Sequence, residues 1–183
     1  MKIIIPICYY FLLLLLSGCL VSETIEYKLI LNDDGKSGKV TVVMRNVQSD
    51  ESDPDKQEKD FKELISNWKS DKYLIEQVEK GFYVKERKLY LEKGKLVWKE
   101  TSLFADIRKL IPEYTSDNTT RISLGDTTGL QITTNGKIIA EDDSTVIVWK
   151  PGTKVFEFKT TARNFTSTSK FAKRFQQYSK RSK

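Results

Sequence analysis

Two neighbouring segments of this chain alternate apolar and polar residues, and this pattern constrains the fold more than any other feature. Residues 23–32 and 39–47 carry apolar side chains at every second position. The shared faces hold Ile25, Tyr27, Leu29, Leu31, Val40, Val42 and Met44. A period of two is typical of a strand with one buried face. The stretch 32–38 contains two glycines, which can adopt the positive φ of tight turns. The sequence therefore predicts an antiparallel hairpin.

The spacing changes from strand to helix after residue 51. Ser52-Asp53-Pro54 supplies a capping side chain and a proline for the first helical turn. Helical spacing then places four apolar residues on one stripe, namely Phe61, Leu64, Ile65 and Trp68. We expect Trp68 to pack this helix on the sheet. A second short helix, containing Tyr73, is predicted to end at Gly81.

The rest of the chain contains short strand patterns and two more helical stretches. Strands are predicted at 82–91, 96–101, 120–124, 129–134, 137–140, 145–150 and 154–160. Helices are predicted at 102–110, ended by Pro112, and at 169–180. Strands, helices and strands follow one another without βαβ alternation, which favours an α+β fold. We expect one antiparallel sheet or meander with two or three helices packed on it.

The N-terminus indicates where the protein resides. Lys2 is followed by the uncharged, largely apolar run 3–16 and then by Ser17-Gly18-Cys19. This run is too short for an ordinary spanning helix. Leu16-Ser17-Gly18-Cys19 resembles the lipobox of bacterial membrane lipoproteins, in which the chain is cut before the cysteine. The resemblance implies a lipid (fatty-acyl) anchor on Cys19, and the absence of Asp at position 20 then favours the outer membrane if the cell has one.

Two other interpretations of the N-terminus remain open. The uncharged stretch 3–21 approaches the length that crosses a bilayer, so an uncleaved anchor is an alternative. An ordinary secretory signal is another, although no Ala-x-Ala-like site is present. In all three cases the folded part faces away from the cytoplasm. We therefore divide the chain into a signal peptide (1–18), an α+β domain (19–160) and a basic, helical C-terminal segment (161–183).

The composition excludes several kinds of catalytic site. The chain contains no histidine, and its two cysteines are Cys8, inside the signal peptide, and Cys19. Ser-His-Asp and Cys-His triads are therefore impossible, as are zinc sites built from His and Cys. These absences favour a protein that is not an enzyme and has no metal or cofactor. An envelope hydrolase or transferase using carboxylates or Ser and Lys is the alternative.

Two motifs represent that alternative. Ser66-Asn67-Trp68-Lys69 matches S-x-x-K, and Ser116-Asp117-Asn118 matches S-D-N, which are two signatures of serine acyl-enzymes. The third signature, K-T-G, is missing. Acidic residues gather at 50–55 and 141–143, and calcium takes oxygen ligands from such loops. Neither cluster has the spacing of a calcium loop, so solvated loops are the simpler interpretation.

A second resemblance involves the later strands. Thr134-Asn135-Gly136-Lys137-Ile138 precedes Val146-Ile147-Val148-Trp149-Lys150-Pro151-Gly152. An Asn-Gly turn before a strand that ends in Trp is similar to a pattern in envelope lipoproteins of the LppM type. This resemblance implies an α+β domain associated with lipid or glycolipid, and it supplies no catalytic residues.

Positive charge is concentrated at the C-terminus. From residue 160 onward there are no acidic residues and seven basic ones: Arg163, Lys170, Lys173, Arg174, Lys180, Arg181 and Lys183. Such a segment favours an anionic partner, such as lipid headgroups or an acidic envelope polymer, rather than nucleic acid. We expect contact with an anionic surface through Lys170, Lys173, Arg174, Lys180 and Arg181. The alternative is a final helix that Phe171, Phe175 and Tyr178 dock on the sheet. The overall expectation is a lipid-anchored, non-enzymatic binding or structural module of the cell envelope, with lipid, glycan or another envelope protein as its partner.

Overall fold

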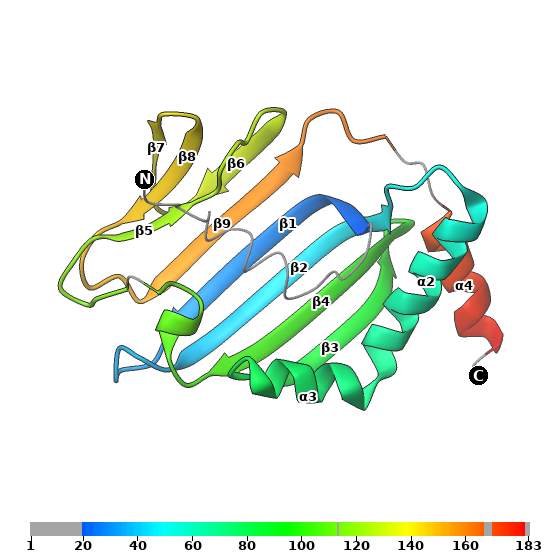
Figure 1. Cartoon of the computed structure of the whole chain (residues 1–183), viewed down its shortest axis with the longest axis horizontal. Coiled ribbons are helices and arrows are strands. Elements are labelled where there is room, and N and C mark those ends of the chain that lie inside the picture. The colour runs from blue at the N-terminus through cyan, green and yellow to red at the C-terminus, as the bar shows by residue number, and fades with distance from the viewer. Residues whose placement is uncertain (1–19, 113, 167–169, 182–183) are drawn as a thin grey trace, which may run out of the picture.

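The computed structural model describes residues 20–112, 114–166 and 170–181. A six-stranded antiparallel sheet has the order β3-β4-β2-β1-β9-β6, and a three-stranded sheet has the order β5-β8-β7 (Figure 1). The larger sheet comprises β1 (Leu20–Leu31), β2 (Gly38–Ser49), β3 (Phe82–Glu92), β4 (Lys95–Phe104), β6 (Leu130–Thr134) and β9 (Val155–Ala162). The smaller sheet comprises β5 (Thr120–Ser123), β7 (Lys137–Glu141) and β8 (Ser144–Trp149). The predicted α+β class and antiparallel pairing are confirmed.

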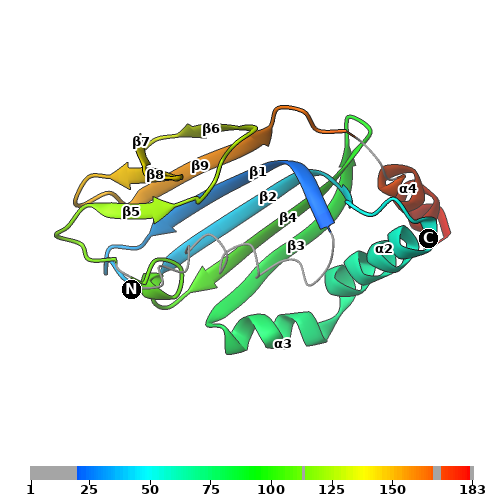
Figure 2. The same ribbon diagram turned by 45° about the horizontal axis from the view of Figure 1, so that its top comes forward.

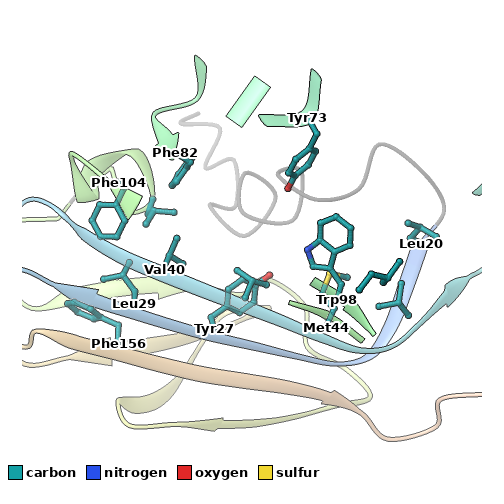
Figure 3. Close-up of a cluster of buried hydrophobic side chains, with 14 of the residues drawn as sticks. Leu20, Tyr27, Leu29, Val40, Met44, Tyr73, Phe82, Trp98, Phe104 and Phe156 are labelled. Carbon is teal, nitrogen blue, oxygen red and sulfur yellow. The ribbon is translucent and has the colours of Figure 1, made fainter. Parts of the chain in front are cut away.

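The register of the larger sheet divides it into an apolar face and a polar face. Tyr27 lies opposite Val42, and Met44 lies opposite Trp98. These side chains project to one side of the sheet, the inner face, where they are buried (Figure 3). The opposite, outer face carries charged residues in alternation with them. The hairpin predicted from the period-two pattern is thus present, with its apolar set buried.

The smaller sheet is joined to the larger one by a close contact between a turn and a tryptophan. Trp149 donates from Nε1 to Asn135 Oδ1 at 2.7 Å. A Cβ added at Gly136 would lie 2.8 Å from atoms of Ile147 and Trp149, so this turn requires glycine. The two parts of the Asn-Gly and Trp pattern therefore touch each other. The strand order is not sequential, because β9 pairs with β1 and β6 rather than with β8.

Three α-helices accompany the larger sheet: α2 (Pro54–Lys69), α3 (Asp71–Glu79) and α4 (Phe171–Arg181), with α4 at one end and α3 running along β3 (Figure 1). Figure 2 shows α2 and α3 on the same side of this sheet. Asp53 is the N-cap of α2, where its side chain accepts a hydrogen bond from Asp55 N, and Pro54 occupies the first turn as predicted. Gly81, with φ of 90°, follows α3 at its predicted end.

One local prediction was wrong, and another was incomplete. The helix expected at 102–110 is instead the end of β4, because Ser102 and Phe104 pair with residues of β2 and β3. Only a 3-10 turn, η1 (Ile107–Lys109), follows it. The prediction for Trp68 was incomplete: its side chain packs against the core, and its ring also meets that of Phe175 in α4 edge to face. The apolar stripe of α2 therefore contacts α4 as well as the core.

We predict that Gly38→Ala destabilises the fold. A Cβ at this position would overlap the carbonyl oxygen of Ile30 and the ring of Phe104, both of which are held by the sheet. Overpacking of this kind costs about 1–3 kcal/mol, to be measured as the free energy of unfolding in urea. Lys39→Ala, at the exposed neighbouring position, should change it by less than about 0.5 kcal/mol. Equal effects of the two variants would contradict the close approach at Gly38.

Candidate membrane-facing site

The start of β1 lies at the end of the molecule that also carries α4 and the start of α2 (Figure 1). The predicted lipidation site, Cys19, lies outside the described residues, and Leu20 directly follows it. Leu20 is buried in the core and pairs with Ser49 at the end of β2. Next to Ser49, the Gln48 side chain donates to the carbonyl of Thr166 at 3.1 Å. The chain that leads into α4 is thereby held beside the start of β1 (Figure 1).

Helix α4 turns most of its basic residues outward. Lys170, Lys173, Lys180 and Arg181 are exposed, and none of them forms an ion pair with another described residue. Arg174 differs, because its side chain is half-buried and lies 3.0 Å from a Glu58 oxygen. Four of the five residues predicted to contact an anionic surface are thus exposed, three on α4 and Lys170 directly before it, whereas Arg174 is paired with Glu58 within the fold.

The apolar side of α4 is attached to α2 through aromatic rings. Phe171 meets Phe61 at a centroid distance of 5.3 Å, and Phe175 meets Trp68 at 5.8 Å. Phe171 and Phe175 are both buried. Lys69 adds a contact that the sequence reasoning missed, since its ammonium lies 4.9 Å from the centre of the Tyr178 ring. Its position in the last turn of α2, beside Trp68, was the only available signal.

A buried polar cluster attaches α3 to the sheet. Glu100 is only 7% exposed and accepts hydrogen bonds from the Tyr73 hydroxyl at 2.8 Å and from Ser102 at 3.2 Å. Arg87 lies over the Tyr73 ring at 5.0 Å and donates to the carbonyls of Asn67 and Ser70, where α2 ends. Sequence reasoning missed this cluster, although Glu100 falls at the period-two position of an apolar face.

Burial governs the ionisation of this cluster. Desolvation raises the pKa of the Glu100 carboxyl above its ordinary value, although the hydroxyls of Tyr73 and Ser102 and the charge of Arg87 act in the opposite direction. Desolvation and the nearby Glu100 also raise the pKa of the Tyr73 hydroxyl. Trp98, two residues before Glu100, has a buried Nε1 with no hydrogen-bond partner among the described residues. The cluster is therefore a costly polar insertion in an apolar face.

The fold does not bring the serine motifs together. Ser66 and Lys69 lie on α2, whereas the loop with Ser116 lies at the other end of the sheet, where the Ser116 carbonyl accepts from Gly152 N. Asp50, Asp53 and Asp55 are exposed, and Asp53 caps α2. Within the described ranges, no group of three or more His, Cys, Asp or Glu side chains is arranged to hold a metal ion.

Two of the open hollows on the described part of the surface are large enough to consider. One of about 510 Å³ lies against β1, β2, β6 and β9, and its charges are paired, with Lys28 at 2.5 Å from Glu157 and Lys159 at 3.6 Å from Glu26. The other, of about 740 Å³, includes Arg163 and the exposed turn between β7 and β8. Asp126, Asp142 and Asp143 also line it. Neither hollow presents the excess of basic side chains found on α4.

Comparisons with protein-family models, curated proteins and solved structures found no match to this chain. In the part of the chain that the structure describes, no helix is long and apolar enough to pass through a bilayer. The basic face of α4 beside the start of β1 is therefore the candidate site on geometric grounds alone.

We predict that Glu100→Gln changes how stability depends on pH. The folded-state pKa of Glu100 is raised above its unfolded value of 4.5. The contribution of the Glu100 side chain to stability is therefore complete below pH 4.5. The contribution is lost as the pH rises through the folded-state pKa. Glutamine cannot ionise, so the free energy of unfolding of the variant relative to the natural chain should improve between pH 4 and pH 7, measured by urea titration.

Glu86→Gln is the matched control, with the opposite sign. Glu86 lies on the outer face, where Lys88 and Lys99 lower the pKa of its carboxyl. Its contribution is present above the ordinary pKa and lost as the pH falls. The Glu86→Gln variant should therefore lose stability relative to the natural chain between pH 4 and pH 7. The same trend in both variants would show that Glu100 is not held in a desolvated site.

Proposed function

We propose that this chain is a lipid-anchored protein of the bacterial cell envelope that acts as a non-enzymatic binding or structural module. Acylation of Cys19 attaches it to a membrane, the outer one if the cell has two, with the folded part facing away from the cytoplasm. Helix α4 then rests its basic face on anionic lipid headgroups. No cofactor, metal or nucleic acid takes part in this activity.

One observation supports the proposal most directly: the start of β1 and α4 share one end of the molecule. Leu20 pairs with Ser49, and the neighbouring Gln48 holds Thr166, only four residues before Lys170. A lipid on Cys19 would therefore bring α4 to the membrane surface without a linker. Each basic residue near an anionic surface contributes about 1 kcal/mol, so four exposed residues provide a strong orienting force.

The lipid assignment is tested at Cys19. We expect Cys19→Ser to abolish incorporation of a labelled fatty acid by the cells that express the chain, because the acceptor sulfur is removed. The natural chain should be labelled and should fractionate with membranes. Equal labelling of the two chains would refute the lipoprotein proposal.

The contact of α4 with headgroups is tested on the full, lipidated chain. In the processed chain Cys19 is acylated, so a Gln177→Cys variant provides one reactive thiol on exposed α4 for an environment-sensitive fluorophore. In vesicles containing phosphatidylglycerol we expect a blue shift in emission, which high salt should reverse. Changing Lys170, Lys173, Lys180 and Arg181 to Gln should remove most of this shift.

A second labelling position serves as the control. Asp143 is exposed in the turn between β7 and β8, at the far end of the molecule from α4 (Figure 1). A fluorophore on the Asp143→Cys variant should respond to neither lipid charge nor salt. Equal emission from positions 143 and 177 would show that α4 does not face the membrane.

A further inference from the structure

A cation outside α4 extends its basic face. Lys69 is the last residue of α2, and its ammonium lies 5.4 Å from the centre of the Trp68 ring and 4.9 Å from that of Tyr178. An ammonium over an aromatic face is attracted by the ring quadrupole. The ammonium is thereby positioned at the seam where the end of α2 meets α4.

This ammonium belongs to no ion pair between described residues. Lys56 and Lys62, on the same helix, pair with Glu51 and Glu58, whereas no ion pair between described residues includes Lys69. Its side chain is exposed. A lysine in the last turn also stabilises the C-terminal end of a helix, but that role does not explain why its head group is held over a ring of another helix.

Arg181 provides the second cation of the seam. It follows Tyr178 by three residues, so the two side chains are neighbours on one side of α4. Arg181 is exposed, and no described residue forms an ion pair with it. Helical spacing thus places Arg181 next to Tyr178 on the surface of α4, and the ring of Tyr178 carries the Lys69 ammonium. An ammonium and a guanidinium on one side of a helix pair match the oxygens of a phosphate group.

We propose that Lys69 and Arg181 form a binding site for the phosphodiester of an anionic phospholipid headgroup. The inference rests on the proposed function, and it makes one position of the basic face specific for phosphate. The other exposed basic residues of α4 would contribute only diffuse attraction. Neutralising Lys69 should therefore weaken headgroup contact more than neutralising a lysine elsewhere on α2.

The test uses the full, lipidated chain with the fluorophore at position 177. The mole fraction of phosphatidylglycerol that gives half of the emission shift is measured for Lys69→Gln, Lys69→Arg and Lys62→Gln. We expect Lys69→Gln to raise this fraction about five-fold, the effect of losing one hydrogen bond of about 1 kcal/mol to the phosphate, and Lys69→Arg to restore it. Lys62→Gln, an exposed residue of the same helix, should leave it nearly unchanged. Equal effects of Lys69→Gln and Lys62→Gln would overturn the site.

Two further arms separate phosphate recognition from bulk charge. Vesicles made anionic with a fatty acid, at matched surface charge, should not distinguish Lys69→Gln from the natural chain. Glycerol phosphate should compete better than chloride at the same ionic strength. A difference between Lys69→Gln and the natural chain that appears only with phosphatidylglycerol supports the site. The same difference with both lipids overturns it. If the natural chain shows no shift with any anionic vesicle, the proposed function itself fails.

A loss of folding is checked separately. Lys69→Gln removes two ring contacts, so α4 could loosen without any change in phosphate affinity. The melting temperatures of the Lys69→Gln and Lys69→Met variants, measured without vesicles, should agree within error. In buffer, the fluorophore at position 177 should have the same emission in both variants as in the chain with Lys69 unchanged. A change of that emission in buffer would assign Lys69 to helix packing and overturn the site.

Discussion

The separation of the larger sheet into an apolar and a charged face is the constraint on which the rest of the structure depends. Tyr27, Val42 and Trp98 project to the inner side, and their neighbours Glu26, Lys28 and Lys99 project to the outer side. Aromatic side chains bury about 150–250 Å² each, so most of the stabilisation comes from the inner side. The ion pairs outside are solvent-exposed and contribute at most about 1 kcal/mol each.

Helix attachment follows from this asymmetry but uses different interactions at each helix. Tyr73 anchors α3 through a buried carboxylate, whereas Phe171 and Phe175 anchor α4 through rings on α2. Because those two phenylalanines are already buried against α2, they are not free to enter a bilayer. Contact of α4 with a membrane would therefore be peripheral, made by its charged side, and sensitive to salt.

Much of the fold could be predicted from spacing along the chain. The first hairpin, the Asp53 cap and the end of α3 at Gly81 were predicted, because each depends on local residue type. The segment 102–110 was not, because its helical spacing of apolar residues competes with strand pairing to Val40 and Gly38, which lie far away in sequence. The pairing of β9 with β1 was likewise missed. Strand order depends on such distant partners, which local patterns do not specify.

The candidate site was predictable in its charges but not in its arrangement. The basic residues at 170–181 are evident from residue type alone, whereas the pairing of Arg174 with Glu58 and the position of Lys69 over Tyr178 depend on how α4 meets α2. The contact between α4 and α2 also limits what the four exposed basic residues (Lys170, Lys173, Lys180 and Arg181) can contribute. Alone they would bind a membrane only marginally, but the proposed lipid tether would make their contact intramolecular and raise the effective concentration of headgroups. Their contribution would then lie in orientation. If α4 rests against the surface as proposed, the smaller sheet, at the opposite end of the molecule in Figure 1, would be the part turned away from the membrane.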